Sequence, residues 1–234
     1  MRTHITLLLD RSGSMSGIKE QTITGFNEFI KEQQKLPDYA SVLFAQFDTE
    51  DPFEIREDFT NLQDVTLLNW DNFNPKGSTP LLDAIGKGIA YTKDNLKKHS
   101  QNKKTEIDDF SDGLPELVIF VIITDGQENA STEFKRETIK KTIEDHEKHG
   151  WKFVFLGANM DAVQEASSIG ISFGQAATYT TTGACGYTGA CGSQGAQGIM
   201  GATYALNNIA SNFRNGNTNY TFTVDDREKM EKGY

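Results

Sequence analysis

Three short segments of the chain carry side chains whose oxygen atoms could bind a metal ion. The first, residues 10–14, reads DRSGS and offers one carboxylate and two hydroxyl groups directly after an apolar run. The other two, residues 77–80 and 123–126, read GSTP and ITDG. Hard oxygen ligands of this kind suit Mg²⁺, with Mn²⁺ or Ca²⁺ as alternatives, and offer nothing to a soft metal. The three segments together predict a site for one divalent cation.

Each segment taken alone also fits a purely structural role. Serine is common at helix N-caps and in turns, so Ser12 and Ser14 could serve only there. Thr79 followed by proline matches an ordinary helix start, and Asp125 followed by glycine is typical of a turn. The metal hypothesis is favoured because three separate segments agree with one predicted structural context.

The elements that must position these segments alternate in type along the chain. Apolar runs of strand length alternate with segments of helical period, which is typical of a parallel sheet with crossover helices. The short link between residues 47 and 53 favours an antiparallel hairpin. We expect strands at 5–10, 41–47, 53–59, 116–124, 152–156 and 171–173, a strand-like stretch at 221–224, and helices at 18–35, 80–98, 133–149, 161–169 and 202–213. In such a sheet all three segments fall at the edge where ligands bind, beyond the carboxyl ends of the strands.

Glycine recurs at every third residue from 183 to 201, seven times in all. Strict Gly-X-Y triplets fit a collagen-like or polyglycine-type helix, in which only glycine fits at the crowded axis. The tract has no proline, however, and a flexible loop is the alternative. We predict residues 1–182 as the domain core, 183–201 as an inserted tract and 202–234 as the helix and tail that complete the domain. An ordered tract would point to a homo-oligomer.

Composition and charge argue against several kinds of partner. The formal net charge of −10 disfavours nucleic acid and anionic membranes, since binding to phosphate needs clustered cations. No apolar stretch approaches the length of a membrane span, and the first apolar run is too short for a signal peptide. A cytoplasmic or virion location is therefore expected. The two cysteines, Cys185 and Cys191, are too few to stabilise a chain of 234 residues through disulfides. A disulfide between them would close a short loop and is one alternative, and free thiols are the default in a reducing compartment.

The three segments, in this order and at these separations, resemble the metal-ion-dependent adhesion site (MIDAS) of von Willebrand factor A domains. Within that family the chain resembles small stand-alone members from bacteria and tailed phages, in residues 23–27 (ITGFN), 46–48 (QFD), 125–131 (DGQENAS) and 155–159 (FLGAN). The resemblance implies a Rossmann-like three-layer α/β/α sandwich with a mostly parallel six-stranded sheet and one antiparallel edge strand.

The same resemblance implies the roles of the candidate site residues. Ser12, Ser14 and Thr79 would supply hydroxyl oxygens to the metal, and Asp10 and Asp125 would hold it largely through bound water. One coordination position would remain for a carboxylate of a protein partner. The chain would then be a divalent-cation-dependent adhesion or adaptor module.

Two other functions are weighed against the adaptor. The glycine tract favours a structural or adhesive component of a phage particle, assembled through that tract. An aspartate at the end of a first strand could instead be the nucleophile of a haloacid-dehalogenase-like phosphatase, a metal-dependent phosphohydrolase. That chemistry needs an acid two residues later, and residue 12 is a serine, so we expect no enzymatic activity.

Two expectations concern residues around the site. Arg11, Ser78 and residues 127–129 are expected to form the surface around the metal and to set specificity. Asp83 lies in the first turn of a predicted helix, where a carboxylate favours the positive end of the helix dipole. We therefore predict Asp83 as a dipole partner and not as a metal ligand.

Overall fold

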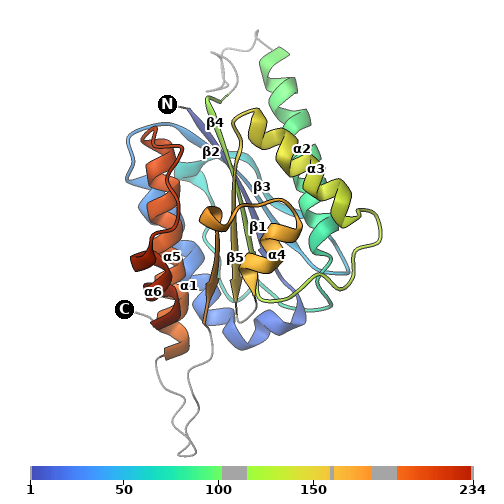
Figure 1. The fold of residues 1–234 in the computed structure, drawn as a ribbon, viewed down its shortest axis with the longest axis vertical. Helices are drawn as coiled ribbons and strands as arrows, with labels where there is room; N and C mark the ends of the chain where they lie inside the picture. Colours follow the sequence, from blue (N-terminus) through green and yellow to red (C-terminus); the bar gives the residue numbers. More distant parts are fainter. Residues whose placement is uncertain (1, 102–114, 159–160, 181–193, 233–234) are drawn as a thin grey trace, which may run out of the picture.

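A six-stranded sheet forms the centre of the computed structural model, which describes residues 2–101, 115–158, 161–180 and 194–232 (Figure 1). The strand order is β3-β2-β1-β4-β5-β6, and all neighbours are parallel except the β2–β3 pair. The strands are β1 (Thr3–Asp10), β2 (Ala40–Phe47), β3 (Glu54–Asn61), β4 (Leu117–Thr124), β5 (Lys152–Ala158) and β6 (Ala176–Tyr179). The mostly parallel sheet with one antiparallel edge strand, expected from the sequence, is confirmed.

Helices cover both faces of this sheet, which gives three layers (Figure 1). One face carries α1 (Lys19–Gln34), α5 (Gln194–Arg214) and α6 (Val224–Lys232). The other face carries α2 (Leu81–Gln101), α3 (Arg136–Lys148) and α4 (Ala162–Ser168). Three short 3₁₀ helices complete the description: η1 (Gly13–Ile18), η2 (Leu62–Asp64) and η3 (Phe173–Gln175). No helix in the described ranges combines the length and the apolar character needed to cross a bilayer.

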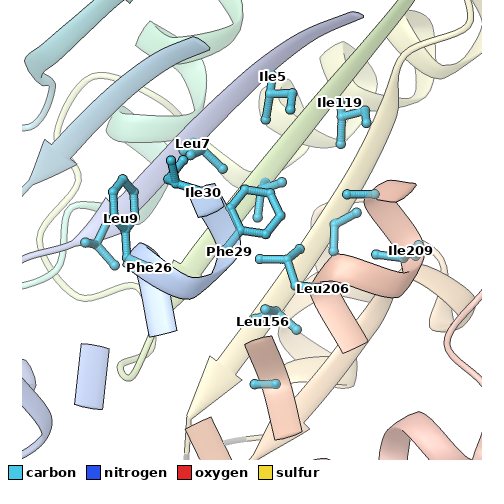
Figure 2. Close-up of a cluster of buried hydrophobic side chains, with 14 of the residues drawn as sticks. Ile5, Leu7, Leu9, Phe26, Phe29, Ile30, Ile119, Leu156, Leu206 and Ile209 are labelled. Atoms are coloured by element: carbon cyan, nitrogen blue, oxygen red, sulfur yellow. The ribbon is translucent and has the colours of Figure 1, made fainter. Parts of the chain in front are cut away.

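The central strands are apolar because helices cover them on both sides. In β1, Ile5, Leu7 and Leu9 face α1 and α5, while Leu8 faces the opposite helix layer. Figure 2 shows the first of these two cores, in which aromatic and aliphatic side chains of α1 and α5 pack on β1 and β4. A parallel strand that is buried on both faces has a nearly continuous run of apolar residues, as β4 does with its sequence LVIFVIIT. This packing fixes the carboxyl ends of β1 and β4 next to each other.

The last part of the glycine tract is helical, which corrects the prediction of a loop or collagen-like insertion for residues 194–201. A methyl group added to Gly198 would lie 1.7 Å from the carbonyl oxygen of Thr180, and one added to Gly201 would lie 2.2 Å from that of Lys229. The triplet spacing therefore lets other backbone segments pass close to one face of α5. Residues 181–193, with Cys185 and Cys191, lie outside the described residues.

Two short elements also differ from the sequence prediction. The last strand lies at 176–179 and not at 171–173, because the chain enters η3 at Phe173 before Ala176 pairs with Phe155. The expected strand-like stretch at 221–224 instead leads into α6. Thr223 and Asp226 form a capping box there: Asp226 accepts from the Thr223 backbone N–H at 2.8 Å, and its own N–H donates to Thr223 Oγ1 at 3.1 Å.

Candidate metal centre

The three predicted segments meet at one edge of the sheet. Asp10 is the last residue of β1, and Asp125 directly follows β4. Because β1 and β4 are parallel neighbours, their carboxyl ends lie side by side. Gly77 has a φ of +66°, a left-handed conformation that favours glycine, and its carbonyl accepts from the Gly13 N–H at 3.0 Å. This contact brings the segment before α2 against the DRSGS turn.

The five predicted residues lie close together at this edge. Ser12 Oγ lies 3.1 Å from Ser14 Oγ, and Ser14 Oγ donates to Asp125 Oδ1 at 2.6 Å. Asp10 Oδ1 accepts from the Ser12 backbone N–H at 2.6 Å. Thr79 lies across from Ser14, since a methyl group added to Gly126 would lie 3.1 Å from Thr79 Oγ1 and 3.9 Å from Ser14 Oγ. All five residues therefore surround a common region.

Both carboxyl groups lie where a negative charge is unfavourable. Burial raises the pKa of Asp10 to about 6, and the charge of Asp125 adds to this, although hydrogen bonds from Thr124 and Ser12 act in the opposite direction. Burial also raises the pKa of Asp125, with the Ser14 hydroxyl opposing the shift. Asp10, Ser12 and Thr79 are buried, whereas Ser14 is exposed and Asp125 partly so. The cluster thus opens to solvent on the side of Ser14 and Asp125.

The chemistry of these donors fits a hard divalent cation. All five side chains offer oxygen, and two of them are carboxylates close enough for the charge of Asp125 to raise the pKa of Asp10. In the part of the chain that the structure describes, no three histidine, cysteine, aspartate or glutamate side chains gather to hold a metal. A cation at this edge would therefore depend on the hydroxyl groups of Ser12, Ser14 and Thr79.

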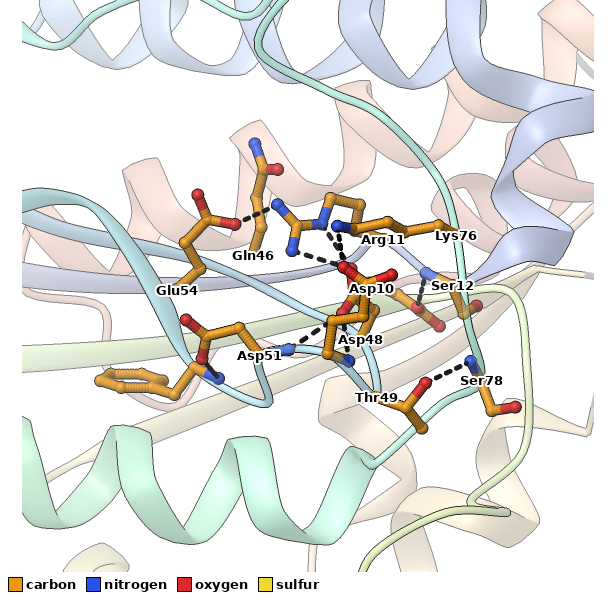
Figure 3. A network of polar contacts seen from close by, with 12 residues as sticks. Asp10, Arg11, Ser12, Gln46, Asp48, Thr49, Asp51, Glu54, Lys76 and Ser78 are labelled. Atoms are coloured by element: carbon orange, nitrogen blue, oxygen red, sulfur yellow. Dashed lines mark hydrogen bonds and ion pairs between the residues drawn. The ribbon is translucent and has the colours of Figure 1, made fainter.

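Arg11 does not contribute to the exposed surface around the cluster, contrary to the sequence expectation. Its guanidinium points away from the site and is buried against Asp48, with Nε donating to Asp48 Oδ2 at 2.8 Å and Nη1 donating to Glu54 (Figure 3). Asp48 Oδ1 in turn accepts from the backbone N–H groups of Glu50 and Asp51, at 2.7 and 3.1 Å. Arg11 thus fastens the DRSGS turn to the loop after β2.

Residues 127–129 agree with the prediction in part, since Gln127 and Asn129 are exposed whereas Glu128 is half-buried. Gln127 and Ser78 are exposed and remain available at the rim. Glu128 instead accepts from the Leu82 N–H at 2.8 Å, and Asn129 Oδ1 accepts from the Thr79 N–H at 2.9 Å. Asp83, expected as a dipole partner, is almost fully buried and accepts three backbone N–H groups of residues 132–134. The sequence motif DGQENAS contained Glu128 and Asn129 but gave no indication of these contacts.

The architecture is the Rossmann-like three-layer α/β/α sandwich that the sequence resemblance implied, with the three site segments at one edge of its sheet. Comparisons with protein-family models and with curated proteins found no match. Among solved structures, proximal thread matrix protein 1 from the mussel byssus is 17% identical over 76% of this chain and 41% of that chain, with a TM-score of 0.45.

Two further solved structures are similar at the same level. The mussel protein with a zinc-occupied MIDAS motif is 16% identical, with a TM-score of 0.45, over 76% of this chain and 41% of that chain. A von Willebrand factor type A protein from Catenulispora acidiphila is 7% identical, with a TM-score of 0.46, over 89% and 42%. The chain thus spans about two fifths of the length of these proteins. The assignment of the site rests on the geometry of this chain's own residues.

Proposed function

We propose that the chain is a divalent-cation-dependent protein-binding module, in which Asp10, Ser12, Ser14, Thr79 and Asp125 hold Mg²⁺. The observation that carries this proposal is the hydrogen bond from Ser14 to Asp125, at 2.6 Å, beside Thr79 at the carboxyl edge of the sheet. It joins residues from distant parts of the sequence around one oxygen-rich region.

The residues of the chain favour a cation that can still accept a further ligand. When bound, Mg²⁺ would supply a positive charge with a coordination position for an acidic side chain of a partner. Three of the five donors are neutral hydroxyl groups, which cancel less of that charge than carboxylates would. The exposed Ser14, with Ser78 and Gln127 at the rim, leaves this side of the cluster accessible to a partner.

Binding is favoured over catalysis by the placement of proton-transfer groups. His4 lies near the start of β1, at the opposite end of that strand from Asp10. His146 and His149 lie at the end of α3, just before β5 begins, and so at the amino edge of the parallel sheet, away from the cluster at the carboxyl edge. Residue 12, where the phosphatase chemistry needs an acid, is a serine whose hydroxyl is hydrogen-bonded to that of Ser14, and a serine hydroxyl cannot act as a general acid at neutral pH. We therefore propose no hydrolytic reaction at this site.

Two measurements test this function. Isothermal titration calorimetry with Mg²⁺ should give about one equivalent bound by the wild-type chain and none by Asp125→Ala. Affinity capture from host extract should then retain a partner in Mg²⁺ and lose it in EDTA or with Asp125→Ala. The matched control is Glu50→Ala, which removes an exposed carboxylate at the same edge and should leave capture intact. Capture that persists in EDTA would contradict the proposal.

A further inference from the structure

The N-terminus of α2 is capped by side chains from the loop that follows β4. The first N–H groups of a helix have no partner within the helix. Here Leu82 N–H donates to Glu128 Oε2 at 2.8 Å, and Asp83 N–H donates to Ser131 Oγ at 3.0 Å. A carboxylate at a helix N-terminus also interacts favourably with the helix dipole. The start of α2, two residues after Thr79, is therefore held by the loop that begins with Asp125.

The capping is reciprocal, because α2 returns a carboxylate to the same loop. Asp83 Oδ2 accepts from the Thr132 N–H at 2.8 Å, and Asp83 Oδ1 accepts from the N–H groups of Glu133 and Phe134 at 3.0 and 2.8 Å. Asp83 is only 2% exposed, so these bonds are shielded from water. Each segment thus satisfies backbone donors of the other.

Glu128 also fixes the shape of its own loop. Its Oε1 accepts from the N–H groups of Ala130 and Ser131 at 2.8 and 2.7 Å, and its Oε2 accepts from Ser131 Oγ at 2.6 Å. With the bond from Leu82, four donors surround one carboxylate. Charge-assisted bonds of this kind are stronger than neutral ones, so this carboxylate ties the loop to α2 firmly.

We propose that Glu128 and Asp83 are positioning residues that set the distance between Thr79 and Asp125, and thereby the affinity of the site for Mg²⁺. This inference rests on the proposed metal-binding function. Glu128 lies three residues after Asp125, and its partner Leu82 lies three residues after Thr79, so the clamp joins the two segments close to the ligands. Groups that orient metal ligands typically change metal affinity about 10- to 100-fold when they are replaced.

The test replaces Glu128 by glutamine, which keeps the size of the side chain but puts an amide NH₂ where one oxygen accepts hydrogen bonds. Calorimetric titration with Mg²⁺ alone should show affinity for Glu128→Gln reduced by about 10-fold or more. Ser131→Ala, which removes the hydroxyl shared by Glu128 and Asp83, should reduce the affinity by a smaller factor.

The matched control is Asp226→Asn. Asp226 caps α6, accepting from the Thr223 N–H and hydroxyl at 2.8 Å each, and it contacts none of the five proposed ligands. Its replacement should lower the melting temperature measured in EDTA while leaving the Mg²⁺ affinity at the wild-type value. If Glu128 contributed to stability alone, Glu128→Gln would likewise lower the melting temperature in EDTA and leave the Mg²⁺ affinity at the wild-type value.

The outcomes separate this inference from the proposed function. If the wild-type chain binds Mg²⁺ and Glu128→Gln binds it with wild-type affinity, the positioning role is overturned and the metal site stands. If Asp226→Asn loses as much Mg²⁺ affinity as Glu128→Gln does, the positioning role is also overturned. If the wild-type chain binds no Mg²⁺, the proposed function fails and the inference fails with it. If Glu128→Gln does not fold, Ser131→Ala takes its place. A reduced Mg²⁺ affinity of Ser131→Ala then supports the positioning role, and a wild-type affinity overturns it.

Discussion

Asp10 combines burial with two short hydrogen bonds, one from the Thr124 hydroxyl and one from the Ser12 N–H, both at 2.6 Å. Its pKa is raised to about 6, mainly by burial, so an ionised Asp10 destabilises the cation-free protein at neutral pH. A cation beside the carboxylate would remove that cost. Stability in Mg²⁺ and stability in EDTA should therefore respond differently to the loss of this charge.

The variant Asp10→Asn separates the two contributions. In EDTA its free energy of unfolding should stay within about 1 kcal/mol of wild type, because the amide keeps an acceptor and removes a buried charge. In Mg²⁺ at about 100 times the wild-type dissociation constant, wild type should gain about 2.7 kcal/mol and the variant should gain nothing. Urea unfolding with and without Mg²⁺ measures both. Equal stabilisation of the variant by Mg²⁺ would exclude Asp10 from the site.

Arg11 supports the site through a buried ion pair. Its Nη2 lies 2.8 Å from Asp48 Oδ2, and Asp48 is fully buried. Arg11→Met should destabilise the protein by about 3–5 kcal/mol, because it leaves the Asp48 charge buried without its cation. Lys76→Ala, which breaks the exposed pair with Glu50, should give no measurable change in the same urea experiment. Similar losses in both variants would contradict this account of the Arg11 pair.

At the scale of elements, the close contact between α5 and α6 depends on a glycine, Gly201, which has no side chain. Gly201→Ala would place a methyl group 2.2 Å from the Lys229 carbonyl oxygen, and backbone atoms cannot move aside as a flexible side chain can. We expect a loss of about 1–3 kcal/mol in the free energy of unfolding, as for an overpacked core. The control is Gly17→Ala, whose added methyl group meets nothing within 4 Å and should cause no such loss. A Gly201→Ala protein as stable as wild type would contradict the close packing.

The sequence predicted most elements because their patterns are strong, and it failed where tertiary contacts decide. The apolar run of β4 and the helical period of α2 predicted both elements within a few residues of their observed bounds. The helical start of α5 was missed because three-residue spacing of glycine fits both a collagen-like helix and one face of an α-helix. The start of α6 carried a readable signal, since Thr223 and Asp226 have the spacing of a capping box.

The same distinction applies to the candidate site. The meeting of the three segments that carry the candidate ligands was predictable because their motifs coincide with the carboxyl edge of a parallel sheet. Metal binding by these five residues remains a prediction, whereas their proximity is a property of the structure. The contacts that Arg11, Glu128 and Asn129 make with other parts of the chain were not predictable, because charged and amide side chains near a site are equally consistent with an exposed rim without such contacts. Only their partners, such as Asp48 and Leu82, decide between the two.

At the scale of the whole molecule, the adaptor and the particle component differ in oligomeric state. The glycines at 198 and 201 pack against Thr180 and Lys229 of the same chain, so this part of the tract has its partner within one molecule. We therefore expect a monomer of 26.0 kDa in size-exclusion chromatography with light scattering. A stable trimer or larger array would favour assembly through the glycine tract and the alternative of a phage-particle component.

The location of the cation can be measured most directly by anomalous diffraction from crystals of this chain soaked in Mn²⁺. The account predicts one strong anomalous peak among the side-chain oxygens of Ser12, Ser14 and Thr79, with Asp10 and Asp125 beside it, and no peak there in crystals of Asp125→Ala. An Mn²⁺ peak found only elsewhere on the molecule, with this cluster empty, would contradict it.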